Sequence, residues 1–209
     1  MLRKGPPPGN PYHILQLNNE LSSGSIVLDP SDLEDGPQPF LLRDPLHELW
    51  VSFMLMRGLG LLVHGCGVKM DGKVHIFVGE SGAGKSTLAR VFDNLKVGHI
   101  LSDDRLIIRT EADNYTVYGT PWHGEAPYAS PESGQLATIN FLHKAPKSAI
   151  EVMQPESAAS ALFMVCFLAG WPRSGMDFIL KCCTEIVRRV PCRRLFFTPD
   201  QTAIEAAGI

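Results

Sequence analysis

The sequence VHIFVGESGAGKST, residues 74–87, decides the fold class, because it joins an apolar run to a glycine-rich loop and then to the start of a helix. Residues 79–86 match the pattern G-x-x-x-x-G-K-[ST] at every specified position. Glycines in such a loop let successive backbone N–H groups turn towards phosphate oxygens, and the N-terminus of the following helix adds positive charge. The stretch therefore predicts a phosphate-binding loop between a strand over 74–78 and a helix over 85–94.

The residues of this loop would divide the binding of a nucleotide between them. We expect Lys85 to reach the β- and γ-phosphates and the Ser86 hydroxyl to bind Mg²⁺, with Thr87 one position further along the helix. The predicted backbone and side-chain contacts to the nucleotide include Gly79, Ser81, Gly82, Ala83 and Gly84. ATP and Mg²⁺ are the ligands that this motif predicts.

The strand before the loop has a predicted antiparallel partner. Two β-rich runs, 59–68 and 74–78, flank Asp71-Gly72, and an Asp-Gly pair between such runs indicates a hairpin. His64 lies in the first run, and pairing through this turn would bring it alongside the glycine-rich loop. A histidine in an apolar strand is also a common hydrogen-bonded structural residue, so both roles stay open here.

An acidic pair, Asp103-Asp104, follows a predicted strand over 99–101. A strand that ends in an acid beside a phosphate loop is the usual place for a Mg²⁺-holding aspartate. One carboxylate can hold the metal while the other accepts a proton from an attacking hydroxyl. The residues alone do not say which aspartate does which, and a solvated turn with capping aspartates is the alternative.

A third segment, YGTPWHGE at 118–125, concentrates Gly, Pro, His and Glu after a predicted strand over 115–118. His123 or Glu125 could point at a metal or a phosphate from such a loop. An ordinary turn is the competing interpretation.

These features occur in a fixed order: VHGCG at 63–67, the Asp-Gly hairpin, GESGAGKST at 79–87 and LSDDRLIIR at 101–109. This combination resembles the catalytic domain of HPr kinase/phosphorylase and the wider group of HPr-kinase-related proteins. The resemblance covers roughly residues 46–198. It implies an α/β fold with a P-loop on a mixed sheet, as in phosphoenolpyruvate carboxykinases.

The resemblance also implies roles for individual residues. The catalytic base would fall on Asp104, and Asp103 would lie next to the metal. His64 would tune or relay the proton, while Lys85 and Ser86 would hold nucleotide and Mg²⁺. The implied activity is ATP-dependent transfer of a phosphoryl group to a hydroxyl, and the implied assembly is a homo-oligomer.

Several departures from the family pattern bear on the acceptor. The family's GKSE is GKST here, so Thr87 stands where the family has an acid beside the metal. The family's later Glu-Ile-Arg-Gly segment is not visible, and Glu125, in PWHGE at a comparable place, is the candidate for its acidic role. The C-terminal signature that docks HPr is not apparent, so a Ser or Thr of another peptide or small protein, or a small molecule, is the expected acceptor. A non-catalytic nucleotide-binding module remains the main alternative. An ABC-type ATPase and a carboxykinase are weaker ones.

Composition excludes several classes of protein. The 209 residues carry a formal charge of −3, and 44% of them are hydrophobic, which is typical of a globular protein without a basic nucleic-acid-binding surface. Five cysteines without Cys-x-x-Cys spacing argue against a disulfide framework or a zinc ribbon and favour reduced thiols in a cytoplasmic protein. The start of the chain has no apolar signal-peptide core, and the apolar run 158–171 is too short to span a membrane.

The chain divides by composition into an N-terminal extension, residues 1–43, with loop and short strands, and a P-loop domain, residues 44–209. Asp44-Pro45 is a predicted helix start. Towards the C-terminus the pattern predicts a strand near 139–142, helices over 156–169 and 176–189, a strand over 194–198 and a short end helix. The arginines at 188, 189, 193 and 194 would hold an acidic substrate or a neighbouring subunit, or complement a helix dipole.

Overall fold

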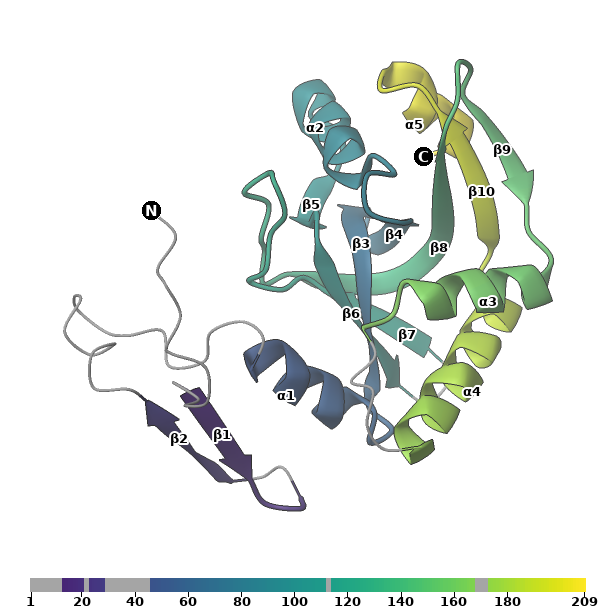
Figure 1. The fold of residues 1–209 in the computed structure, drawn as a ribbon. Helices are drawn as coiled ribbons and strands as arrows, with labels where there is room; N and C mark the ends of the chain where they lie inside the picture. The colour runs from purple at the N-terminus through teal and green to yellow at the C-terminus, as the bar shows by residue number, and fades with distance from the viewer. Residues whose placement is uncertain (1–12, 21–22, 29–45, 112–113, 168–172) are drawn as a thin grey trace. The chain divides into compact units, whose positions relative to one another are not determined.

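The computed structural model describes residues 13–20, 23–28, 46–111, 114–167 and 173–209. The chain divides into two compact units, Met1–Met54 and Leu55–Ile209. In the first unit, β1 (His13–Leu17) pairs antiparallel with β2 (Gly24–Leu28), and α1 (Leu46–Leu55) reaches the boundary (Figure 1). The helix start predicted at Asp44-Pro45 lies outside the described residues.

The second unit is an α/β structure built on a mixed sheet, as the sequence predicts. Its strands are β3 (Gly60–Met70), β4 (Lys73–Val78), β5 (His99–Ser102), β6 (Arg105–Glu111), β7 (Asn114–Tyr118), β8 (Ser133–Lys144), β9 (Ala149–Val152) and β10 (Cys192–Phe197). They follow the order β4-β3-β6-β7-β8-β10-β9, with β5 also paired to β3. The β4–β8 and β8–β10 pairs are parallel, and the others are antiparallel. Because β4 pairs with β8 as well as β3, the strands β4, β3, β6, β7 and β8 close into a ring.

In the described part of this unit, four helices cover the sheet: α2 (Lys85–Leu95), α3 (Pro155–Met164), α4 (Arg173–Arg189) and α5 (Gln201–Ala207). Figure 1 shows α2 and α5 together at one end of the sheet, and α3 beside α4. Each helix was predicted, but α3 ends earlier than the predicted range of 156–169. Residues 165–167 instead run beside β3, where Cys166 forms a bridge with Val63. The periodicity did not predict β9.

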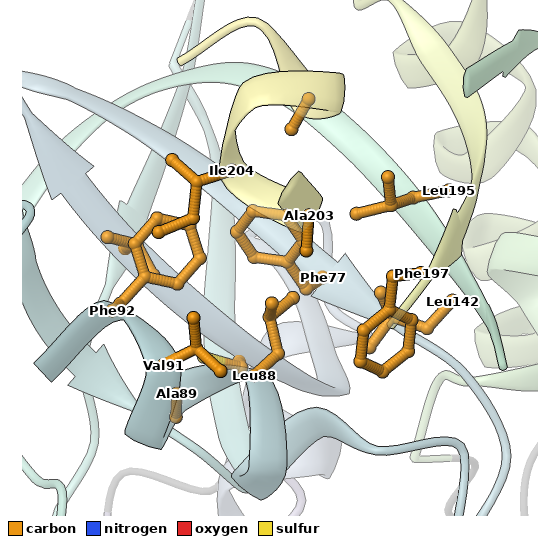
Figure 2. Close-up of a cluster of buried hydrophobic side chains, with 13 residues drawn as sticks. Phe77, Leu88, Ala89, Val91, Phe92, Leu142, Leu195, Phe197, Ala203 and Ile204 are labelled. Carbon is orange, nitrogen blue, oxygen red and sulfur yellow. The ribbon is translucent and has the colours of Figure 1, made fainter. Parts of the chain in front are cut away.

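The hydrophobic core that fixes α2 lies between this helix, α5 and the sheet (Figure 2). Leu88 and Phe92 stand one helical turn apart on α2, and both are fully buried. Phe92 packs against Phe77 of β4, with ring centroids 5.4 Å apart. Burying a side chain of this size stabilises the fold by about 2 kcal/mol, so the position of α2 and of the loop before it is strongly determined.

The central strand β3 sets the geometry of the candidate site. The turn at Asp71 and Gly72 has positive φ at both residues, 49° and 77°, which is the conformation that suits a tight hairpin. The predicted β3–β4 hairpin is therefore confirmed, with Gly65 opposite Val78. On its other edge, β3 pairs first with β5 and then with β6, where His64 lies opposite Arg105. The end of β4 and the break between β5 and β6 thus meet at the same part of β3.

No helix in the described part of the chain is long and apolar enough to cross a membrane.

Candidate functional site

The glycine-rich loop joins the end of β4 to the first turn of α2. Gly82 and Gly84 have φ of 79° and 105°, in the left-handed region that favours glycine. A Cβ on Gly84 would also lie 2.6 Å from Cζ of Phe197. Both glycines are therefore required by the path of the backbone.

Lys85 folds back across its own loop. Its side chain is buried, and Nζ donates hydrogen bonds to the carbonyls of Gly79 and Glu80 at 2.9 and 3.0 Å. Burial lowers the pKa of Lys85, and the nearby Asp104 carboxylate opposes that effect. The ammonium group is thus held at the inner wall of the loop, near the acidic pair.

The acidic pair lies in the break between β5 and β6, and Ser102 shapes this turn. The Ser102 hydroxyl accepts hydrogen bonds from the backbone N–H groups of Asp104 and Arg105 at 3.1 and 3.2 Å. It donates to the carbonyl of Trp122 at 2.9 Å, which ties the turn to the loop over 119–125. The turn places the two carboxylates in different surroundings.

The Asp103 carboxylate is 1% exposed and is held by backbone. It accepts hydrogen bonds from the N–H groups of Gly124 and Ala126 at 2.8 and 3.3 Å. A Cβ on Gly124 would lie 2.9 Å from Asp103 Oδ2 and 3.4 Å from Ser86 Oγ. Because glycine has no side chain, the space between these two oxygens is free of side-chain atoms from residue 124.

A hard cation such as Mg²⁺ fits this pair of donors. A carboxylate has about four lone-pair directions, and two backbone donors leave some of them for a metal. Mg²⁺ is usually bound by one or two carboxylates together with phosphate oxygens and water. Among the described residues, no group of three or more His, Cys, Asp or Glu side chains is placed to hold a metal, so the protein itself offers few ligands.

The Asp104 carboxylate is held by side chains. Arg105 Nη1 donates to Oδ2 at 2.6 Å, and His64 Nδ1 lies 3.2 Å from Oδ1 and 2.9 Å from the Asp104 carbonyl oxygen. The hydrogen bond from His64 lowers the pKa of Asp104, burial opposes this, and the charge of Arg105 lowers the pKa further. The structure therefore brings His64 to Asp104 through the pairing of β3 with β6, whereas the hairpin predicted only that His64 lies alongside the glycine-rich loop.

Arg105 is a part of the site that the sequence reasoning missed. Its guanidinium carbon lies 4.9 Å from the ring centre of Phe167 and 5.6 Å from that of Trp122. Cations are attracted to the faces of aromatic rings, and the two rings hold the guanidinium in place beside Asp104. The only local signal was an arginine next to the acidic pair, because Phe167 is distant in sequence.

Most of the predicted site residues line one cavity of about 380 Å³, here called the loop cavity. Its lining includes the predicted residues His64, Ser81, Gly82, Gly84, Lys85, Ser86, Thr87, Asp103, Asp104 and Glu125. Gly124 and Lys144 also line it and were not predicted. The Glu125 side chain is 85% exposed, with its carboxylate 4.0 Å from Arg90 Nη2. His123 is exposed too, and its Nδ1 lies 3.2 Å from the carbonyl of Gly124.

Among the described residues, two further cavities share lining residues with the loop cavity. The first, the Asp104 cavity, has about 570 Å³ and shares His64, Ser81 and Asp104 with it. The second, the α3 cavity, has about 590 Å³ and shares Ser81, Gly82 and Lys144 with it. The predicted residues Gly79 and Ala83 line the α3 cavity. The glycine-rich loop is thus a common wall of all three cavities.

The arginines near the C-terminus make separate contacts. Arg193 Nη1 donates to the carbonyl of Ala207 at 2.9 Å, near the C-terminal end of α5, and Arg194 Nη1 donates to Glu151 at 3.0 Å. Arg188 and Arg189 lie in the last turn of α4, where positive charge complements the helix dipole. The structure therefore divides these residues between α4 and β10.

All five cysteines are free, as predicted. Cys166 and Cys183 lie with their sulfur atoms 3.9 Å apart, within one buried region. Burial raises the pKa of Cys192 to about 12, which is typical of an unreactive core thiol.

Comparison with known proteins does not assign this chain to a family. No protein-family model matches the chain. A search of curated proteins finds no match either.

Proposed function

We propose that the protein is an ATP- and Mg²⁺-dependent phosphotransferase related to the HPr-kinase-like proteins. The observation that carries this proposal is the loop cavity. It combines Ser81, Gly82, Gly84, Lys85 and Ser86 of the glycine-rich motif with the acidic pair and His64. Each of these groups has a part in phosphoryl transfer. A cytoplasmic location is part of the proposal.

The loop and Lys85 would bind the phosphates of the donor. The backbone N–H groups at the start of α2 point towards the loop end of the helix, where an anion is stabilised. The Lys85 ammonium, now 2.9 Å from Gly79 O, lies close enough to the loop to exchange this partner for a phosphate oxygen. Both groups would stabilise the negative charge that spreads over the transferred phosphoryl group.

Asp103 and Ser86 would hold Mg²⁺, because Gly124 keeps the space between them free of side-chain atoms. When bound, the ion supplies positive charge that neutralises the phosphate oxygens. The buried Asp103 carboxylate is already oriented by two backbone donors, so it would bind without rearrangement.

Asp104 would accept the proton of the acceptor hydroxyl. Its lowered pKa keeps it ionised at neutral pH, and His64 and Arg105 hold the carboxylate at a fixed orientation. The Asp104 cavity, open to the same carboxylate, is the space in which a hydroxyl of a peptide, a small protein or a small molecule would approach.

The test compares wild-type protein with Asp104→Asn. Radiolabelled ATP and Mg²⁺ are supplied with water alone and with a panel of serine-containing peptides and free alcohols. We expect phosphoryl transfer to fall at least 100-fold, while calorimetry shows ATP affinity within about threefold of wild type. Asp93→Asn, which removes an exposed carboxylate from α2, is the matched control and should leave both properties unchanged. Unchanged transfer in Asp104→Asn would exclude this residue as the base.

One observation favours the alternative of a nucleotide-binding module without transfer activity. Asp104 Oδ2 is already paired with Arg105 at 2.6 Å, which reduces its tendency to take a proton. Tight MgATP binding with no transfer to any acceptor in the panel would support this alternative.

A further inference from the structure

We propose that the α3 cavity binds the nucleoside, meaning the base and ribose, of the phosphate donor. This inference rests on the proposed function, in which the loop cavity holds the phosphates of the donor. It adds where the nucleoside of the donor binds and which residues contact it. The loop cavity has about 380 Å³ and is lined mainly by polar and charged residues, which suits phosphates and a metal. The base and ribose need an adjoining, more apolar space.

The position of Asp104 selects between the two adjoining cavities. In phosphoryl transfer the attacking and leaving oxygens lie roughly in line on opposite sides of the phosphorus. Asp104 and His64 line the Asp104 cavity and not the α3 cavity. The acceptor therefore approaches from the Asp104 cavity, and the rest of the donor must leave the loop cavity at another place, past Ser81, Gly82 and Lys144.

Strand direction brings the α3 cavity to the loop. β8 runs parallel to β4, so its C-terminal residues reach the same edge of the sheet as the glycine-rich loop. Lys144, the last residue of β8, lines both the loop cavity and the α3 cavity. A nucleotide that extends from one cavity into the other would pass this cation.

The wall of the α3 cavity has the chemistry that a base and ribose require. Ser157, Ala161 and Met164 are spaced by four and three residues, so they share one face of α3. Met153 lines the cavity as well, and thioether side chains adapt well to flat aromatic rings. Met164 is 78% exposed and lines both the α3 cavity and the Asp104 cavity, so its side chain is accessible from either space.

The charges around the two adjoining cavities also differ. Lys144 and Arg194 line the α3 cavity, and Glu80 is the one carboxylate among its lining residues in the described chain. Two carboxylates, Glu80 and Asp104, line the Asp104 cavity together with one arginine, Arg105. A polyanionic nucleotide is therefore better accommodated on the side of Lys144 than on the side of Asp104.

The test separates the nucleoside from the phosphates. Calorimetry measures the binding of Mg²⁺–ATP and of Mg²⁺–tripolyphosphate to the full chain and to Ala161→Phe, which fills the α3 cavity. We expect the affinity for ATP to fall at least tenfold in this variant, while the affinity for tripolyphosphate stays within twofold. Ser160→Phe is the matched control, because Ser160 is exposed on the same helix and does not line the cavity, and it should bind both ligands as wild type does.

If Ala161→Phe does not fold, Met153→Ala is measured in its place. We expect this variant to bind ATP several-fold more weakly than wild type and to bind tripolyphosphate with unchanged affinity. Wild-type ATP affinity in both folded variants, or an equal loss of both ligands, would overturn the nucleoside site. Failure of the proposed function looks different: the wild-type protein would then bind neither ATP nor tripolyphosphate, or would bind ATP without transferring its phosphoryl group to any acceptor.

Discussion

Two adjacent aspartates have distinct environments in this protein, and the difference arises from single hydrogen bonds. Asp103 is turned inward to backbone N–H groups, whereas Asp104 meets Arg105 and His64. The Ser102 hydroxyl accepts hydrogen bonds from the N–H groups of Asp104 and Arg105 and so stabilises the turn in which the two carboxylates diverge. The arrangement supports Asp103 as the metal ligand and Asp104 as the base in the proposed reaction, the assignment that the family resemblance implies and that the residues alone left open.

Gly124 gives the first residue-scale prediction. We expect Gly124→Ala to reduce the Mg²⁺-dependent part of ATP affinity by about tenfold, as changes beside metal ligands commonly do, because its Cβ would lie 2.9 Å from Asp103 Oδ2. Calorimetry with and without Mg²⁺ measures this. His123→Ala changes the neighbouring exposed residue and should behave as wild type. Equal Mg²⁺ dependence in Gly124→Ala and wild type would argue against a metal at Asp103 and Ser86.

His75 gives a second prediction, on pH dependence. Its Nδ1 lies 2.9 Å from Thr138 Oγ1, and this hydroxyl accepts a hydrogen bond from Asn140 Nδ2, so its own proton is directed at the histidine. Burial lowers the pKa of His75 below the ordinary value of 6.5, and Arg193 and Lys73 add to the effect. The unfolded chain therefore takes up this proton at a higher pH than the folded one does.

The sign of the effect follows from that difference. Stability from neutral His75 is present above pH 6.5 and is lost as the pH falls towards the lowered pKa of the folded state. We expect the free energy of unfolding to decline less steeply between pH 7 and 5 in His75→Gln than in wild type. Urea unfolding at several pH values measures both slopes. Identical slopes would show that His75 is not a source of the pH dependence.

At the scale of elements, β3 positions the two halves of the site, the end of β4 and the start of β6, next to one another. The same strand places Val78 opposite Gly65 on one edge and Arg105 opposite His64 on the other. The hairpin half of this arrangement was predictable, because Asp71-Gly72 favours one turn type and that turn sets the register. The other half was not, because the pairing of β3 with β5 and β6 depends on long-range contacts that no local pattern encodes.

Gly119 supports the loop that ties into the acidic turn, and it gives an element-scale prediction. A Cβ there would lie 2.1 Å from the Ser130 carbonyl oxygen and 2.9 Å from that of Leu101, both backbone atoms that cannot rotate away. We expect Gly119→Ala to lower the free energy of unfolding by about 2 kcal/mol or more. Gly58→Ala is the comparison, because Gly58 has a φ of 99° but a Cβ added there would meet no atom of the described residues within 4 Å, and backbone strain alone should cost about 1 kcal/mol. Denaturant unfolding measures the loss of unfolding free energy in each variant. An equal loss in both would mean that the loop around Gly119 shifts to accommodate the added methyl group.

The candidate site shows the same division between local and long-range information. The glycine-rich loop and the start of α2 were predicted because their residues are consecutive in the sequence. Arg105 meets Phe167, and Asp103 meets Gly124, only because the sheet folds residues far apart in the chain onto one edge. The α3 cavity was not predicted either, since its walls come from the loop, β8 and α3.

At the scale of the whole second unit, closure of the sheet through β4 and β8 makes distant segments depend on one another. β4 lies between β3 and β8, and its Phe77 packs between α2 and the strands in the core of Figure 2. Each strand of the ring is held by both of its neighbours, so a lost packing contact in one strand weakens the pairing of the next. We therefore expect a substitution at Phe77 to destabilise the whole unit.

Phe77→Ala tests this dependence. Removing a fully buried phenylalanine costs about 3–5 kcal/mol through lost burial and a residual cavity, against a typical total stability of about 5–15 kcal/mol. We expect urea unfolding followed by circular dichroism to show a loss of this size, and hydrogen exchange to quicken together in β3, β4 and β8. Val152→Ala, at a position 74% exposed on β9, should change stability by about 0.5 kcal/mol or less. Faster exchange confined to β4 would show that the ring does not unfold as one cooperative unit.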